Sequence, residues 1–381
     1  MTYKVWPFMP QHGVDEVLEW KTDILRTYEG EQRVMLRNAP RQFLSYTFLM
    51  NEHTLSKARA LAYGWGGGQF GIPVWTEVIF VGAVSSSATS ITVDTTTSEY
   101  VVGGQVLIWQ DDSNYAEATV ASITSTQLNL SGTVGKTFTA AYVCPLRLGK
   151  MVDGFSIQRG PYTNFKSSAE FRVDDNSAYA AASGLPTLLG LEILTDTMYH
   201  LGGADEKIIR EVEGMDNLTG KVYAPVKYAR SDQTFYVGFS LQTRTDIKRI
   251  RSWLHTNKGR LTPFWLISQS HDLTLTSDVG AADTSIEVNS IGYGGNYTQT
   301  AIRILRTNGT ATYHRVSSGS TVGSVDVLNL SAAAGVAATI AGTESISFMQ
   351  CVRLDSDRVE ISHQENHYAS IKVPCIEVPV P

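Results

Sequence analysis

The chain contains few groupings of side chains that could do chemistry, and the sharpest is a pair of histidines. His363 and His367 frame the segment HQENH. A helical zinc motif places its glutamate directly after the first histidine and both imidazoles on one helix face. Here the glutamate comes two residues after His363, and the surrounding residues alternate as in a strand that leads into a loop. We therefore expect no metal ion at this motif and no cofactor elsewhere in the chain.

Acidic residues cluster at three places: Asp111–Asp112, Asp174–Asp175, and Asp355 with Asp357. Each falls where a hairpin turn is expected, and aspartate favours turns because its carboxylate accepts hydrogen bonds from nearby backbone N–H groups. None of them has the spacing of a calcium-binding loop. Turn formation is the interpretation we adopt for all three.

A glycine-rich segment, GGGQFG at residues 66–71, has the composition of a phosphate-binding loop. It lacks the Lys-Ser/Thr pair of a P-loop, and it leads into a Pro-x-Trp motif rather than a helix. We interpret it as the connection between a helix and a strand.

The densest cluster of positive charge lies on and just after a predicted helix and comprises Arg244, Lys248, Arg249, Arg251 and Arg260. A nucleic-acid groove would require an excess of basic residues, but the chain has 31 basic and 37 acidic residues and a net charge of −6. We predict a solvated face or one that forms salt bridges with a neighbouring subunit.

The elements that must position these side chains occur twice. Residues 43–75 and 235–265 both read as an alternating strand, a helix, a glycine-containing loop and a Pro-x-Trp motif. Aligning Thr54 with Asp246, the predicted N-caps, superimposes one apolar helix stripe on the other. The stripes are Leu55, Ala58, Leu61 and Ala62 against Ile247, Ile250, Trp253 and Leu254. The Pro-x-Trp motifs are expected to be equivalent core anchors: Pro73 and Trp75, Pro263 and Trp265.

The similarity continues downstream in the same order. The matched segments are 90–93 with 285–288, 105–108 with 301–304, the identical LNLS of 128–131 with 328–331, 146–148 with 352–354, and 170–173 with 375–378. This region is rich in Ser, Thr, Gly and Val and alternates strictly, as small antiparallel sandwiches and barrels do. It reads as an insertion, because the strands that flank it could pair directly without it.

These patterns predict a mainly β fold with a few short helices, built as an internally duplicated core of antiparallel β-structure plus one helix. Each copy carries an inserted small β-sandwich or barrel. The expected units are residues 1–80 with 146–173 (first core), 81–145 (first insertion), 174–221 (connector or arm), 222–272 with 351–381 (second core) and 273–350 (second insertion). Within the connector, residues 205–211 have a polar, helix-like pattern.

Length and composition narrow the class of protein. The 381 residues are ample for several cores, and the three cysteines form no C-x-x-C pair, which argues against a disulfide framework or thiolate zinc site. The first residues lack a signal-like apolar run, and no apolar stretch reaches the roughly 18 residues of a membrane span. We expect a soluble protein without a membrane span.

No motif of an enzyme is evident. A nucleophile elbow G-x-S-x-G is absent, and Ser, His and Asp show no association in the sequence. A glycosidase carboxylate pair is assembled only by the fold, yet it should appear as an acidic cluster in one repeat and not in the other. We see none and predict that the protein is not an enzyme.

Two segments resemble a known family. Residues 19–24 (EWKTDI), followed by 30–41 (GEQRVMLRNAPR), are similar to the opening of tail proteins from long-tailed bacteriophages, and so is the helix followed by GRLTPFW at 259–265. The resemblance implies a distal-tail-type virion protein, made in the host cytoplasm, that forms a closed ring in the tail tip or baseplate. Its implied partners are itself, the tail tube protein, and hub and fibre proteins. Ordinary distal tail proteins carry one such core, whereas this chain is duplicated.

Two other classes of function remain open at this stage. One is a carbohydrate-binding, receptor-recognition protein of the virion, suggested by the two β-insertions and by 17 Tyr and 7 Trp. The other is a hydrolase of cell-wall or other polysaccharide.

Overall fold

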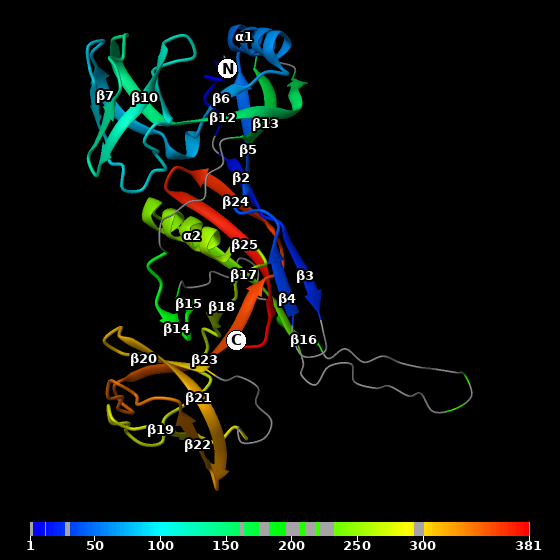
Figure 1. Ribbon diagram of the computed structural model, residues 1–381, viewed down its shortest axis with the longest axis vertical. Coiled ribbons are helices and arrows are strands. Elements are labelled where there is room, and N and C mark those ends of the chain that lie inside the picture. The colour runs from blue at the N-terminus through cyan, green and yellow to red at the C-terminus, as the bar shows by residue number, and fades with distance from the viewer. Residues whose placement is uncertain are drawn as a thin grey trace.

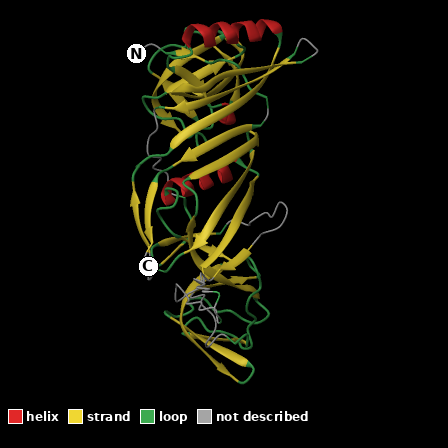
Figure 2. Ribbon diagram, turned by 90° about the vertical axis from the view of Figure 1, so that its right-hand side faces the viewer, coloured by secondary structure: helices red, strands yellow, loops and turns green. Residues whose placement is uncertain are grey.

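The structure is a computed structural model, and it describes residues 3–11, 13–26, 31–160, 164–174, 183–195, 206–209, 218, 220, 232–292 and 301–380. Over these residues the protein is mainly antiparallel β-structure with two α-helices, which confirms the predicted fold class. The two cores lie one above the other along the long axis, with a β-unit beside the upper core and another below the lower core (Figures 1 and 2).

The two cores, here called the first and second repeat, are built from strands in the same order. In the first repeat the elements are β1 (Lys4–Val5), β5 (Arg41–Met50), α1 (Glu52–Trp65), β6 (Phe70–Pro73), β12 (Phe138–Arg159) and β13 (Phe165–Val173). In the second repeat they are β15 (Leu191–Leu194), β17 (Asp232–Leu241), α2 (Arg244–Asn257), β18 (Phe264–Ile267), β23 (Thr343–Leu354), β24 (Arg358–Glu365) and β25 (Tyr368–Glu377). The parallel pairing of β1 with β6 recurs as that of β15 with β18.

The repeats differ by one residue between the first strand and the helix. Phe48 pairs with Ser167, and Phe239 pairs with Ile371. Because Ser167 and Ile371 occupy equivalent places in β13 and β25, Phe48 corresponds to Phe239. The predicted alignment of residues 43 and 235 is therefore one residue out of step in the strand, although it is right in the helix. A slip of one residue exchanges the two faces of a strand, and the buried positions of β5 and β17 follow the corrected alignment.

Both helices begin three residues earlier than predicted. The N-caps are Asn51 and Thr243, whose side-chain oxygens accept hydrogen bonds from the backbone N–H of Thr54 and Asp246. Thr54 and Asp246 thus lie inside the first turn, where an N-cap side chain finds its donor. The equivalence of the two helices is unaffected by this correction.

The Pro-x-Trp motifs do not occupy equivalent positions. Pro73 ends β6, whereas Pro263 precedes β18. Phe70 corresponds instead to Phe264, because their partners Gly149 and Val352 occupy the same place in the strand pairings of β12 and β23. Trp75 and Trp265 are both buried, at 3% and 0% exposure, but they anchor different parts of the fold.

The two insertions carry the same register. Their strands are β7 (Ile79–Val84), β8 (Ser90–Thr92), β9 (Gln105–Trp109), β10 (Tyr115–Thr124) and β11 (Gln127–Leu130) in the first, and β19 (Ser285–Asn289), β20 (Ala301–Arg306), β21 (Ala311–Val322) and β22 (Val325–Leu330) in the second. The LNLS segments are aligned as the sequence predicts, because Ile91 pairs with Leu128 as Ile286 pairs with Leu328. The predicted matches of 146–148 with 352–354 and of 170–173 with 375–378 are out of step by three residues and one residue, respectively. Each insertion surrounds its own apolar cluster. The strands β12 and β23 run without a break from insertion into core, so the predicted boundaries at 145 and 350 fall inside strands.

The remaining elements are β2 (Val14–Glu19), the hairpin β3 (Thr22–Arg26) with β4 (Glu31–Met35), the 3₁₀ turn η1 (Trp75–Glu77), β14 (Thr187–Leu188) and β16 (Glu206–Ile209). The helix-like pattern predicted for 205–211 is wrong where the structure describes it, because residues 206–209 form a strand paired with β17. Much of the connector at 174–221 lies outside the described residues.

Candidate functional site

Strand β2 joins the two repeats into one sheet. It pairs antiparallel with β5 of the first repeat on one side and with β24 of the second repeat on the other. Leu18 and Trp20, at its end, are buried within the apolar cluster of the second repeat. The sequence predicted that residues 1–80 belong to the first core. The structure shows that β2, within this segment, also completes the core of the second repeat.

Glu16 is the polar centre of this junction. It lies on β2 two residues before Leu18, so both side chains point to the same face of the sheet, and it is 1% exposed. Its Oε1 accepts hydrogen bonds from Arg251 at 2.7 Å and from Gln42 at 2.7 Å, and its Oε2 lies 3.1 Å from the His363 Nε2. Gln42 belongs to the first repeat, and Arg251 and His363 to the second. One carboxylate thus links both cores.

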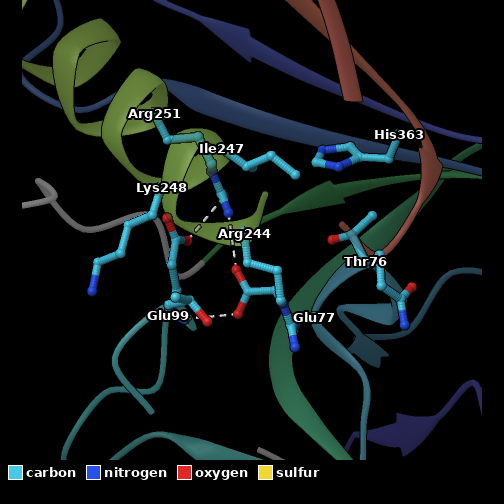
Figure 3. Close-up of a pocket in the computed structure, with 10 residues that line it drawn as sticks. Thr76, Glu77, Glu99, Arg244, Ile247, Lys248, Arg251 and His363 are labelled. Atoms are coloured by element: carbon cyan, nitrogen blue, oxygen red, sulfur yellow. Dashed lines mark hydrogen bonds and ion pairs between the residues drawn. The ribbon is translucent and has the colours of Figure 1, made fainter. Parts of the chain in front are cut away.

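Arg251 extends the junction to the first insertion. Its guanidinium binds Glu77 of η1 at 2.9 Å and Glu99, in the loop before β9, at 2.9 Å (Figure 3). Glu77 in turn accepts a hydrogen bond from the Glu99 backbone N–H at 2.7 Å. The planar guanidinium can serve several carboxylates at fixed angles, which a lysine ammonium would not do.

Burial and neighbouring charges shift the pKa values of Glu16 and Glu99 in opposite directions. Burial alone would raise the pKa of Glu16, but the Arg251 charge and the hydrogen bonds from His363 and Gln42 outweigh it and lower the pKa to about 2. Burial raises the pKa of Glu99 to about 7; Arg251 opposes this shift, and the negative charges of Glu77 and Glu16 add to it. Arg251 forms ion pairs with all three carboxylates, and the negative charge of Glu77 and Glu16 favours the protonated form of Glu99.

The space beside this cluster is small. A pocket of about 20 Å³ lies among Glu77, Glu99, Arg244, Arg251 and His363 (Figure 3). A water molecule needs roughly 10–15 Å³ of such volume, so the pocket has room for one water and not for an organic substrate. The arrangement is suited to fixing the two repeats and the first insertion relative to one another.

The predicted basic face is not one surface. Arg251 is buried in the ion cluster, and Lys248 donates to the backbone carbonyl of Thr96 in the first insertion. Arg249 forms an ion pair with Asp246 within the helix. Arg244 lines the small pocket, and Arg260 binds Asp357 and the Thr22 carbonyl. The structure brings Arg244, Lys248 and Arg251 together against the first insertion and leaves Arg249 and Arg260 apart from them.

The other sequence candidates have structural places. His363 lies on β24 and His367 follows it, so HQENH is a strand and a turn as expected. Asp111 accepts from the backbone N–H of Ser113 and Asn114 in a turn. Asp357 also lies in a turn, but it accepts from Thr22 and Arg260 and so connects distant segments. Asp175 lies outside the described residues.

Arg251 was among the predicted interaction residues, but its partners Glu16, Glu77 and Glu99 were not, although the sequence held one signal for Glu16. Residues 13–18 read GVDEVL and residues 203–208 read GADEKI. This match would have extended the duplication to β2 and marked Glu16 as a repeated acidic position. Glu77 and Glu99 carry no motif, and only the fold brings them to Arg251.

A second, larger cavity lies beside the junction. It has a volume of about 410 Å³ and is lined in part by Trp75, Trp109 and Tyr142. The rings of Trp75 and Trp109 meet edge to face at 5.4 Å, and the Trp109 indole donates to the Pro7 carbonyl at 2.8 Å. This cavity is large enough for a small organic molecule and has three aromatic side chains in its wall.

Comparison of the sequence with known protein families and with curated proteins gives no match. Within the described ranges, no grouping of His, Cys, Asp and Glu side chains has the makings of a metal site. In the same part of the chain, neither helix has the length and apolar character needed to cross a membrane.

Proposed function

We propose that this chain is a structural subunit of the tail tip or baseplate of a long-tailed bacteriophage. In this proposal copies of the chain close into a ring at the distal end of the tail tube and connect the tube to hub or fibre proteins. The observation that carries it is the junction at β2, where two similar cores share one sheet. Such a chain is a two-core segment of a larger ring, and repeating one contact around an axis is how closed rings form.

The hairpin β3–β4 supports a role in binding other proteins. It belongs to the segment that resembles phage tail proteins, and it projects beside the second repeat (Figure 1). The end of the hairpin nearest its turn is held in place, because Arg353 of β23 binds Glu31 through two bonds of 2.6 and 3.1 Å. Its apolar side chains Leu25, Val34 and Leu36 are 64%, 49% and 57% exposed. Exposed apolar residues on a hairpin that is held in place suit a protein partner.

The test is to find the protein in the particle. Tails purified from the phage that encodes this chain should contain it, and gold-labelled antibody should bind at the end of the tail distal to the capsid. Electron microscopy of the purified chain should show closed rings. Absence of the chain from purified tails would refute the proposal.

A second function has one specific observation in its favour. The aromatic cavity of about 410 Å³ has the composition of a site for carbohydrate, since sugar rings stack on Trp and Tyr faces. The chain would then recognise a receptor glycan on the host. A glycan array probed with the full chain tests this, with Trp109→Ala as the variant that should lose any signal and Trp65→Ala, a partly buried tryptophan away from the cavity, as the control.

A further inference from the structure

Each strand of the β2–β24 contact between the repeats has a counterpart in the other repeat, and among the described residues neither counterpart has a partner of this kind. In the first repeat, β2 pairs with β5 so that Leu18 lies opposite Gln42. In the second repeat, β16 pairs with β17 so that Ile208 lies opposite Gln233. Gln42 and Gln233 are equivalent by the strand alignment above. Strand β16 is therefore the counterpart of β2, and Ile208 that of Leu18.

The two counterparts differ in what covers them. Leu18 is 1% exposed, because β2 lies against β24 and the core of the second repeat. Ile208 is 70% exposed, and among the described residues β16 has no strand on its other edge. An apolar strand edge of this kind is available for pairing with another chain.

The surface that would receive β16 is also present. In the second repeat β24 receives β2, and Val359 and Ile361 of β24 are buried at 1% and 0% exposure. Ile361 pairs with Ile371 as Ile157 of β12 pairs with Ser167, so Phe155 and Ile157 are the counterparts of Val359 and Ile361. Phe155 and Ile157 are only partly buried, and from Met151 onward β12 pairs with β13 alone within the described residues.

The residue types of the Glu16–Arg251 ion pair also occur at the equivalent positions of the other repeat. Arg59 has the position in α1 that Arg251 has in α2. The residue that aligns with Glu16 is at position 206 and is also a glutamate. Both the apolar contact and the charges of the internal junction are thus encoded a second time, on β16 and on β12 with the neighbouring helix α1, which lie well apart in the molecule (Figure 1).

We propose that β16 of one chain pairs antiparallel with the β12 edge of a second chain, in the register of the internal β2–β24 junction. Ile208 then lies opposite Phe155, and Lys207 opposite Ser156. The contact is heterologous, head to tail, so it closes into a ring when the rotation permits. This inference rests on the proposed function and names the contact that would build its ring.

A disulfide test reads the register directly. Lys207→Cys combined with Ser156→Cys should give, under mild oxidation, a ladder of covalent oligomers that reducing agent removes. The matched control is Lys207→Cys with Gln158→Cys, one pair further along the same face, where the separation exceeds the reach of a disulfide. The native thiols should not interfere, because Cys144, Cys351 and Cys375 are buried and burial raises the pKa of Cys144 and Cys375 well above the ordinary value.

A second variant tests the apolar contact without new bonds. Ile208→Lys should weaken self-association at least tenfold in sedimentation equilibrium. Val322→Lys, which changes an equally exposed residue (66%) on the second insertion, should leave it unchanged.

The outcomes separate the two proposals. Wild-type rings without the specific ladder would overturn the β16–β12 contact and leave the proposed function standing. The specific ladder from a chain absent from purified tails would support the contact and overturn the function. A wild-type chain that stays monomeric at high concentration and gives no ladder would overturn the contact.

Discussion

The carboxylate of Glu16 and the guanidinium of Arg251 lie 2.7 Å apart, although 235 positions separate them in the chain. Both side chains are nearly fully buried, and they come from different repeats of the same fold. This pair ties the strand that bridges the repeats to the helix that covers the second core. Its integrity should therefore decide whether the two repeats behave as one rigid unit.

Glu16→Gln should destabilise the protein strongly. The amide keeps the shape of the carboxylate but loses its charge, which weakens the bonds from Arg251 and His363 and costs about 1.5–3 kcal/mol. Glu77 and Glu99 still balance the Arg251 charge in this variant. Urea unfolding followed by circular dichroism measures this loss. Asp15→Asn, on the exposed face of the same strand, is the control and should cost less than about 1 kcal/mol. Equal losses for both variants would contradict a special role for Glu16.

The stability should depend on pH in two opposite ways. The folded pKa of Glu99 is raised from 4.5 to about 7, so the native state binds more protons than the unfolded state in this interval. The contribution of Glu99 is present below pH 4.5 and is lost as the pH rises through 7. The folded pKa of Glu16 is lowered to about 2, so its contribution is present above pH 4.5 and is lost as the pH falls toward 2.

Glu99→Gln separates these effects. Melting temperatures from pH 3 to pH 8 should show a smaller decline between pH 5 and pH 8 for the variant than for the wild type. The acid limb, which Glu16 governs, should remain. A variant with an unchanged alkaline limb would show that Glu99 does not titrate in this interval.

The helix caps should contribute similar stabilities in the two repeats. Asn51→Ala and Thr243→Ala each remove the side-chain acceptor of a first-turn N–H and should cost about 1 kcal/mol. Chemical unfolding of each variant is the measurement. His53→Ala, an exposed change in the first turn of α1, should have little effect. A larger loss of unfolding free energy for Thr54→Ala than for Asn51→Ala would contradict the assignment of Asn51 as the N-cap.

The hairpin β3–β4 should loosen when Arg353 is changed to Lys. An ammonium cannot reproduce the two bonds that the guanidinium makes to Glu31. Hydrogen exchange at the amides of β3 and β4 should accelerate, while β19 and β22 of the second insertion should exchange as before. Arg358→Lys is the control, because that side chain is exposed. Unchanged exchange in the hairpin would show that other contacts hold it.

Much of the fold could be predicted where the two repeats share both residue types and spacing. The LNLS segments fall in the same register because their alternating leucines must face the core of each insertion. The helices align because a four-position apolar stripe has only one way to face a sheet. The strand before the helix was misaligned by one residue, since a single extra residue in a loop shifts the register without altering the alternation. The Pro-x-Trp motifs were misleading because their letters match while their places in the strands do not.

By itself the sequence determined the β-rich class, the two helices, the duplication of segments and the turn at Asp111. These follow from local periodicity and residue preference, which need no knowledge of distant partners. Only the tertiary structure decided that β2 crosses from one repeat to the other, and that Glu16, Glu77 and Glu99 converge on Arg251. Alternation has a period of two whatever strand lies alongside, so it says which face is buried and not which edge pairs with which. That choice is made by packing across the whole chain, and here it fixes the junction and leaves one edge of β16 and, from Met151 onward, one edge of β12 without a strand partner among the described residues.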